Sequence, residues 1–411
     1  MCRRFLKYCQ RVYHIREELE SVTDRRLRPQ LPTFRVVGAL FLMACVRAGS
    51  LNGMEVALSK MPKRCVWYQW LRGALPSADR LGEVAALVHV GQLRLLVARH
   101  YRQRRRKKTL NGREGNRLIL VLDGHECFCS YRRCCPNCQK RSVRVDGETR
   151  VQYYHRYVAA YLFRGDSHLM LDMEMQGPKE GEITAARRLM ERVLVAYPRA
   201  FSVVMGDALY ADPELCKRLL AAGKHFIAVL KDDRRDLVGD FQSLADSVES
   251  VRVRYQQREC VCRDIEGFHT WPQVGRPVRV VSSEEKQSAR CQATGKQQSR
   301  QSKWMWVTSL SQHSMDTSTL VQLGHRRWDI ENYAFNELCN RWHADHIYHH
   351  DVNAMTAILL LTFLAYNLFH VWRTRGLQPE LRQQYSTLLL QQHLRADYLT
   401  QLPLAAGRAP P

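Results

Sequence analysis

The sequence predicts an α/β protein with a helical N-terminal domain and a β-rich insertion in its core. Three observations predict this arrangement. Residues 1 to about 110 carry apolar residues at three- and four-residue spacings, which is typical of helices. From Leu118 the pattern changes to short apolar runs that are typical of strands and alternate with helical segments. Between about Asp232 and Lys303, alternating stretches such as VRVRYQ indicate a further, smaller set of strands.

Charge and composition limit the class of protein. The chain has 411 residues, of which 45% are apolar, and this is enough for at least one well-packed core. Lys and Arg number 63 against 40 Asp and Glu, and the formal charge of +23 favours a polyanionic partner such as DNA, RNA or an anionic membrane. Because the charge is spread through segments of ordinary hydrophobic patterning, we expect a globular enzyme or binder of nucleic acid. The N-terminus does not read as a signal peptide, so we expect a reducing cytoplasm.

The N-terminal helical domain, residues 1–110, is expected to end in a basic connector. The run YRQRRRKK, from Tyr101 to Lys108, precedes the turn-prone Asn111 and Gly112. Such a run is usually a solvated surface, and contact with phosphates is an equally good interpretation in a chain this basic.

The segments that follow have the order of the ribonuclease-H-like fold. Predicted strands at 118–124, 157–163 and 168–175 precede a helix at 180–198, a strand at 201–207, a helix and a strand at 224–230. Asp212 and Pro213 mark the start of the second helix, because they are an N-cap residue followed by proline. We therefore expect the core to consist of two parts, residues 111–231 and residues 304–376. The insertion between them is expected at residues 232–303, and a C-terminal tail at residues 377–411.

The second part of the core is expected to contain a strand at 303–310 and two helices, at 318–342 and 354–372. The last helix is apolar and long enough to raise the question of a membrane span. It stands alone and contains Asn367 and His370, so we interpret it as a helix buried in protein and expect no membrane partner.

Three acidic residues form a candidate metal site. Asp123 and Asp207 each end an apolar strand, and Glu331 lies in a later helix beside basic and aromatic residues. Hard divalent cations prefer carboxylate oxygens, and two such ions about 3.5 to 4 Å apart can stabilise the attacking and leaving oxygens of a phosphoryl transfer. Acids at strand ends also mark solvated loops, but three acids in this order favour a site for Mg²⁺ or Mn²⁺.

The motifs around these acids resemble those of a known family. Asp123 is followed by Gly124, Asp207 lies in GDALY at 206–210, and Glu331 lies in RWDIE at 327–331. They are similar to the Asp-Gly turn, the Gly-Asp-x-x-Tyr pattern and the Arg-Trp-x-Ile-Glu-x-x-Phe motif of bacterial insertion-sequence DDE transposases. Specifically, the motifs resemble those of the ribonuclease-H-like branch with a β-rich insertion between the second Asp and the Glu.

The resemblance implies an activity, cofactors and partners. It implies a DNA transposase that cuts transposon ends and joins them to target DNA, with two Mg²⁺ or Mn²⁺ ions bound by Asp123, Asp207 and Glu331. It also implies that double-stranded DNA is the partner, that a homodimer forms on it, that the helical N-terminal domain binds the element's ends, and that the protein is cytoplasmic and nucleoid-associated. Two alternatives stay open, a metal-dependent nuclease of the same fold without strand transfer and a domesticated DNA-binding protein.

Two positions depart from the family motif. The family usually has Tyr three residues before the Arg and Lys seven after the Glu, and here these positions hold Gly324 and Leu338. Because the usual residues help to hold phosphates near the cut, Arg326, Arg341 and Trp342 are candidate replacements.

Other candidate DNA contacts lie in or near the motif. Arg327 could hold a phosphate through its planar guanidinium. Trp328 could stack on a base or pack in the core, and core packing is the commoner case for an aromatic residue on a helix. Lys231, which follows a strand, is a weaker candidate. Glu182 could approach the acidic site or serve as a partner of the helix dipole.

A cysteine-rich segment follows the first predicted strand. Cys135 and Cys138 have the two-residue spacing of a zinc knuckle, and Cys127 and Cys129 could supply a second pair of ligands to structural Zn²⁺. Buried, reduced cysteines are the alternative. His125 would share a strand face with Asp123 and could touch substrate or metal, or could be a hydrogen-bonded structural histidine.

Overall fold

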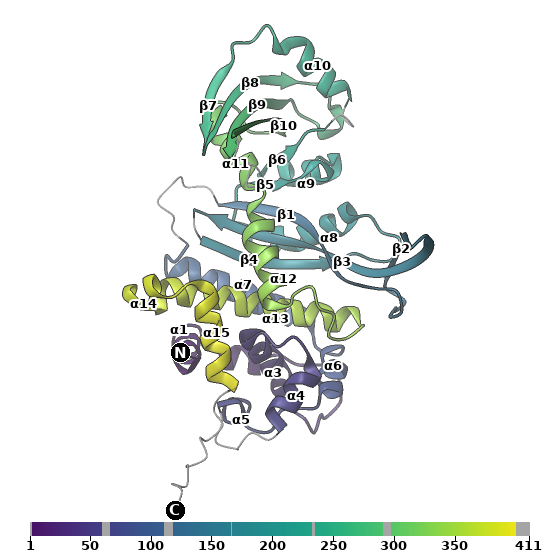
Figure 1. Cartoon of the computed structure of the whole chain (residues 1–411), viewed down its shortest axis with the longest axis vertical. Coiled ribbons are helices and arrows are strands. Elements are labelled where there is room, and N and C mark those ends of the chain that lie inside the picture. Colours follow the sequence, from purple (N-terminus) through teal and green to yellow (C-terminus); the bar gives the residue numbers. More distant parts are fainter. Residues whose placement is uncertain are drawn as a thin grey trace, which may run out of the picture.

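A mixed β-sheet covered by helices on both faces forms the centre of the molecule (Figure 1). The computed structural model describes residues 2–59, 66–110, 118–165, 167–231, 235–290 and 297–399. The predicted α/β class is confirmed. Asn111 and Gly112, the predicted turn after the basic connector, lie outside the described residues.

Helices and turns make up nearly all of the described chain before residue 110. The helices are α1 (Cys2–Tyr13), α2 (Ile15–Glu20), α3 (Thr33–Val46), α4 (Leu51–Ser59), α5 (Val66–Leu71), α6 (Ala78–Ala85) and α7 (Val90–Arg106). α3 is apolar on all sides and is almost wholly buried. It is therefore the core helix of this part of the chain.

The first part of the sheet has the strand order β4-β3-β1-β5-β6. Its strands are β1 (Ile119–Ser130), β3 (Glu148–Arg164), β4 (Ser167–Met175), β5 (Val203–Gly206) and β6 (His225–Val229). β1, β3 and β4 are antiparallel neighbours, whereas β5 runs parallel to β1 and β6 runs parallel to β5. This arrangement fits a ribonuclease-H-like core.

The apolar run of β1 serves two separate cores. Ile119 and Val121 belong to the core on the side of α3, whereas Leu120 and Leu122 belong to the core beneath α8 (Glu182–Ala196) and α9 (Pro213–Ala221). Side chains of a strand alternate between its two faces, so a strand covered on both faces has apolar residues at successive positions. In β1 the first polar position is Asp123, which still pairs with Ala159 of β3.

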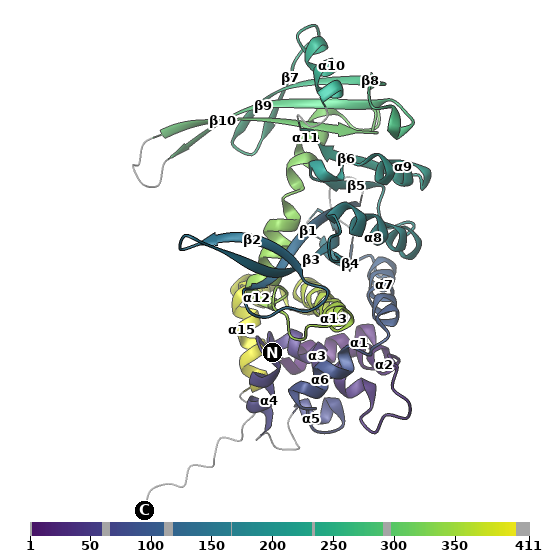
Figure 2. The same ribbon diagram turned by 90° about the vertical axis from the view of Figure 1, so that its right-hand side faces the viewer.

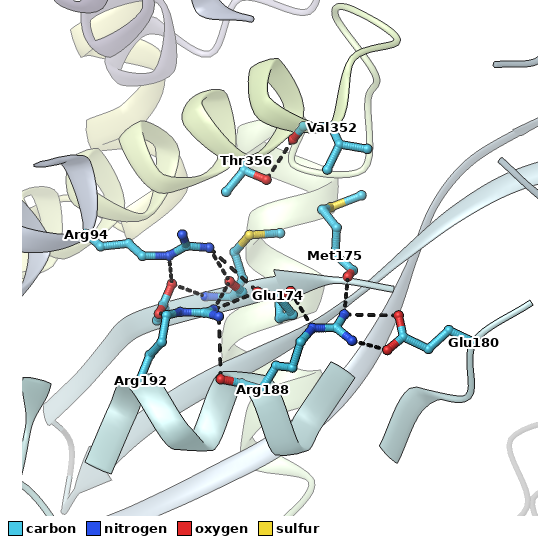
Figure 3. Close-up of polar contacts among 10 residues, drawn as sticks. Arg94, Glu174, Met175, Glu180, Arg188, Arg192, Val352 and Thr356 are labelled. Atoms are coloured by element: carbon cyan, nitrogen blue, oxygen red, sulfur yellow. Dashed lines mark hydrogen bonds and ion pairs between the residues drawn. The ribbon is translucent and has the colours of Figure 1, made fainter. Parts of the chain in front are cut away.

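A network of arginines and acids ties α7 and α8 to β4 (Figure 3). Arg94 of α7 and Arg192 of α8 donate to opposite oxygens of Asp172, at 3.0 and 3.2 Å. Glu174 accepts from Arg188 at 3.0 Å and from Arg192 at 2.8 Å. Asp172 is only 4% exposed, so the network offsets the cost of burying its charge and fixes the N-terminal helices to the sheet.

The long apolar helix α13 (Val352–Val371) is a core element. It continues through the π-helical turn η4 (Trp372–Gly376) and is long and apolar enough to span a membrane, but 94% of its most apolar window is buried by other parts of the protein. Asn367 is fully buried and its amide pairs with both backbone groups of Met170 in β4, at 2.9 and 2.8 Å. The prediction of a helix buried in protein is confirmed. The C-terminal helices α14 (Pro379–Gln384) and α15 (Thr387–Leu399) follow it.

The insertion extends the central sheet. It contains α10 (Arg235–Ala245), β7 (Val251–Tyr255), β8 (Arg258–Phe268), the short turn η2 (Pro272–Val274), β9 (Val278–Arg290) and β10 (Gln297–Thr308). β10 pairs antiparallel with β6 and carries β9, β8 and β7 outward from it (Figure 2). The strand predicted at 303–310 is the inner part of β10.

A basic β-ribbon, which we call the arm, projects from the other end of the sheet (Figures 1 and 2). It consists of β2 (Gln139–Val145) and the first part of β3, joined by Asp146 and Gly147, both at positive φ. Hydrophobic patterning does not predict β2 or the full length of β3, because these segments are exposed and charged and carry no apolar run. The turn sequence Asp-Gly was the available signal.

Candidate functional site

Asp123 and Asp207 lie level on neighbouring parallel strands. The pairing of β1 with β5 ends at Val121 and Met205, and each acid lies two residues farther along the chain. Asp207 then caps the short 3₁₀ turn η1 (Ala208–Tyr210), accepting from Leu209 N at 2.9 Å. Both acids therefore lie just past the end of the β1–β5 pairing, Asp207 directly after β5 and Asp123 within β1, which continues along β3 to Ser130. The expectation that Asp123 ends its strand is wrong.

Glu331 reaches these acids from an irregular helix. α11 (Thr317–Arg326) leads into the π-helical turn η3 (Ile330–Phe335), which continues as α12 (Asn336–Trp342). Arg327 donates through Nη1 to Asp123 Oδ2 at 3.3 Å and to Glu331 Oε1 at 3.4 Å. A single guanidinium nitrogen thus contacts two acids that are far apart in the sequence.

The electrostatics of the site favour an additional cation. Burial raises the pKa of Asp123 to about 7, opposed by Arg327 and reinforced by the nearby charges of Glu331, Asp207 and Glu182. The Arg327 guanidinium is therefore not enough to hold the Asp123 carboxyl ionised in its usual range. A group of carboxylates with this excess of negative charge suits a hard divalent ion.

Glu182 is a fourth carboxylate beside the three predicted acids. It begins α8 and accepts from the Tyr210 hydroxyl at 2.9 Å, and Arg156 lies 3.8 Å from its other oxygen. The ring of Tyr210 packs on Gly206, where any Cβ would lie 2.5 Å from it. The motif Gly-Asp-x-x-Tyr thus has a physical basis, because glycine makes room for the tyrosine that holds Glu182.

Gly124 provides the space for Glu182 next to Asp123. A Cβ at this position would overlap the Glu182 carboxylate. Gly124→Ala is therefore expected to push Glu182 away and to lower metal-dependent DNA cleavage by about tenfold or more, the scale seen for residues that orient metal ligands. Gly91→Ala is the matched control, since a Cβ at Gly91 in α7 meets nothing within 4 Å. Equal cleavage rates for the two variants would show that the position of the Glu182 carboxylate beside Asp123 does not affect cleavage.

An open cavity of about 370 Å³ adjoins the acids. Its lining includes Asp123, His125, Glu331, Phe335 and Cys339. His125 Nε2 contacts Cys339 Sγ at 2.9 Å, and its ring lies 4.8 Å from that of Phe335. His125 does share the cavity with Asp123, and its nitrogen is engaged by a side chain of the protein.

The candidate DNA contacts of the motif differ in exposure. Arg327 is 7% exposed and holds the acids, and Trp328 is 40% exposed with the Arg327 guanidinium 4.6 Å from its ring centre. The commoner expectation for Trp328, core packing, is therefore wrong. Lys231 is exposed and lies beside the insertion, and Arg341 is half-buried in a separate cavity with Glu337.

The candidate replacements at the two unusual positions are largely structural. Arg326 donates to Asp329 at 2.8 Å and to the Gly165 carbonyl at 3.0 Å, and Trp342 is 3% exposed. The suggestion that Trp342 contacts phosphates is wrong, because the indole is part of the core.

The core also explains why the family's Tyr and Lys are absent here. A Cβ at Gly324 would lie 2.5 Å from the Trp306 ring, so no tyrosine fits there. Leu338 is fully buried, so a lysine there would place its charge in the apolar core.

The cysteine-rich segment forms a different cluster from the one expected. Cys135 and Cys138 lie together, but the other two members of the group are His155 of β3 and His350. Cys127 faces the apolar core, and the exposed Cys129 accepts from Gln152 at 3.2 Å. The prediction that Cys127 and Cys129 complete the zinc site is wrong. A register shift in β1 between these two residues separates them further, because Cys127 is buried and Cys129 is exposed.

Comparison with known families agrees with these features. The sequence model of the family described as "Transposase DDE domain" matches residues 134–368, more than half of the chain. No curated protein matches the chain. The matched segment contains Asp207 and Glu331 and begins shortly after Asp123. The chain therefore belongs to the DDE transposases of insertion sequences.

Proposed function

We propose that this transposase cuts the ends of a DNA element and joins them to target DNA by two-metal-ion phosphoryl transfer, with Asp123, Asp207 and Glu331 as the metal ligands. Membership of the family brings a transposase-type nuclease activity that depends on divalent metal ions. The joining step, the pair of ions and the three ligands are our proposal. The observation that carries it is the shared contact of Asp123 and Glu331 with Arg327, beside the strand end that holds Asp207.

The donor set fits Mg²⁺ or Mn²⁺. All three side chains offer carboxylate oxygens, the ligands that these hard ions prefer. Burial, and to a lesser extent the charges of Glu331, Asp207 and Glu182, raises the pKa of Asp123, and a bound cation would oppose both effects. When bound, such ions stabilise the attacking and leaving oxygens of a phosphate. Glu182, held by Tyr210, adds a further carboxylate beside Asp123.

Arg327 is proposed to hold the scissile phosphate. Its guanidinium contacts Asp123 and Glu331 in the free chain and would turn to the phosphate when cations neutralise these carboxylates. The planar, permanently charged group suits phosphate oxygens better than a lysine would. The exposed ring of Trp328, which stacks on Arg327, offers a surface for an unpaired base at the cut.

The arm is proposed as a further DNA contact. Its charged side chains lie on a narrow ribbon and are supported by aromatic rings, with Arg141 4.6 Å from the ring centre of Tyr154 and Lys140 5.6 Å from that of Tyr153. Exposed Arg144 and Arg150 extend the charge toward the tip. A basic β-ribbon can follow a DNA groove and contact phosphates on both sides of it. Recognition of element ends by the N-terminal helices and a homodimer on DNA complete the proposal.

An assay with the DNA that flanks the gene tests the function. Duplexes carrying each flanking sequence, with supercoiled plasmid as target, are incubated with the full chain with and without Mg²⁺. We expect Mg²⁺-dependent cleavage at the element's ends and covalent joining to the plasmid. Cleavage without joining would support the nuclease alternative instead, and DNA binding without cleavage would support a domesticated binding protein.

A further inference from the structure

Two cysteines and two histidines from three separate segments converge beside the root of the arm. Cys135 and Cys138 come from the β1–β2 loop, His155 from β3, and His350 from the connection between α12 and α13. Their ligand atoms all lie within 4.8 Å of one another. Two members are buried and two are half-buried, and the sulfur and nitrogen atoms face one another.

The distances match the edges of a tetrahedron around one zinc ion. Cys135 Sγ and Cys138 Sγ are 3.6 Å apart, and His155 Nε2 lies 3.4 and 3.3 Å from them. Zn–S bonds of about 2.3 Å and Zn–N bonds of about 2.0 Å at tetrahedral angles require S···S near 3.8 Å and S···N near 3.5 Å. The side chains therefore already leave a space of the correct size at their centre.

The backbone around Cys135 and Cys138 also suits a thiolate pair. Cys135 N lies 3.2 Å from Cys138 Sγ and donates to it, and Cys138 N donates to the Cys135 carbonyl at 3.0 Å. A backbone N–H directed at sulfur stabilises the charged form that binds metal. Among the described residues, His350 Nδ1 is buried and has no hydrogen-bond partner. Buried polar atoms normally have a partner, and a metal ion bound by the ring would provide one.

We propose that Cys135, Cys138, His155 and His350 bind one structural Zn²⁺ ion. Thiolate and imidazole ligands select zinc over the Mg²⁺ or Mn²⁺ of the carboxylate site. Four protein ligands leave no open coordination position, so the ion has a structural role. Binding releases the two thiol protons to solvent and involves no change of oxidation state.

The ion would fix two parts of the molecule to one strand. Cys138 directly precedes β2 and His155 follows the part of β3 that pairs with β2, so the metal joins both strands of the arm at its root. His350 brings in the segment that follows α12, the helix after Glu331. The zinc site thus sets the direction of the arm and ties the Glu331 helix to the strands that carry Asp123.

Metal content tests the proposal without any need for transposase activity. The full chain, purified without chelators and passed through gel filtration, is expected to retain about one zinc per chain by mass spectrometry of the elements. C135S/C138S is expected to lose nearly all of it, and C129S/C134S, two exposed cysteines outside the group, is the matched control and should retain it. His350→Gln should weaken zinc retention by about 100-fold or more.

A second measurement needs no variant. The wild-type chain refilled with Co²⁺ is expected to show the visible absorption of tetrahedral cobalt with thiolate ligands, and removal of the metal by a chelator should lower Tm by about 5 °C or more. Three results would overturn the proposal: no zinc in the wild-type chain after incubation with zinc, equal loss in C129S/C134S, or a Cys135–Cys138 disulfide in the zinc-treated protein. None of these results bears on DNA cleavage, so the proposed function is tested separately.

Discussion

Asp123→Asn is expected to lower the rate of metal-dependent DNA cleavage by at least about a thousandfold and, at the same time, to stabilise the metal-free chain above pH 7. The amide keeps the shape of the side chain but removes the charge that would hold a divalent ion, and loss of such stabilisation costs several kcal/mol in the transition state. Cleavage of end-labelled duplex DNA at saturating Mg²⁺ measures the first effect.

The stability effect follows from the pKa of Asp123. Burial raises it to about 7, above the value of 3.8 for an unfolded Asp, so the folded chain binds the proton more tightly than the unfolded chain. The stability that this proton provides is complete below pH 3.8 and is lost as pH rises through about 7. Asparagine has no such loss, so its advantage should grow over this range and reach about 4 kcal/mol above pH 7.

Thermal unfolding of both proteins in EDTA at several pH values measures the difference. The advantage of Asp123→Asn should be near zero at pH 4 and largest at pH 8. The exposed Asp79 gives the control, since Asp79→Asn should leave both cleavage and this pH dependence unchanged. Full cleavage activity in Asp123→Asn would remove Asp123 from the site, and a variant less stable than wild type at pH 8 would contradict the electrostatic account.

Replacing Arg279 with leucine is expected to destabilise the insertion by about 3 to 5 kcal/mol. Arg279 makes two hydrogen bonds to Asp264, at 2.7 and 2.5 Å, with both side chains 2% exposed, and also donates to the Met315 carbonyl at 2.7 Å. Thr317, the first residue of α11, donates to the same carboxylate at 2.6 Å. Leucine would leave a buried, unpaired Asp264 and a free end of α11.

Hydrogen exchange of the β8 and β9 amides measures the local free energy of unfolding. The double variant Arg279→Met with Asp264→Leu should recover most of the loss, because it removes both charges. The exposed pair Arg150 and Glu148, 3.1 Å apart, provides the control, and Arg150→Leu should change stability by less than about 1 kcal/mol. Equal losses of stability in Arg279→Leu and Arg150→Leu would show that burial of the Arg279–Asp264 pair does not increase the effect of breaking it.

The buried centre of the fold was predictable from sequence, and its exposed parts were not. The strands at 119–122, 203–206 and 225–229 are continuous apolar runs because helices cover both faces of the sheet. The arm is rich in charged residues and the outer part of β10 is polar, and the pairing of both depends on backbone hydrogen bonds that any sequence can make. Hydrophobic patterning carries no information about such segments.

The site shows the same division. Asp123 and Asp207 were predicted because each ends an apolar run, and Glu331 because it lies within a helix in the RWDIE motif. The structure brings Asp123 and Glu331 to one guanidinium. The cysteine–histidine cluster could be predicted only in half, because Cys135 and Cys138 share a loop whereas His350 comes from a distant connection. No local sequence pattern predicts that His350 is a ligand, because only the packing of α13 on the sheet brings it near the two cysteines.

The π-helical turn at Ile330–Phe335 makes the position of Glu331 sensitive to deletion of a single codon. A π-helical turn contains one residue more than an α-helical turn, and one residue corresponds to about 100° of rotation around a helix. Loss of a single codon here would restore regular winding and leave α11 and α12 in place, because the turn holds its extra residue as a local bulge, but Glu331 would lose the position that the π-helical turn gives it beside Asp123. A copy of the gene with one codon deleted in frame would thus encode nearly the whole chain and lack nuclease activity.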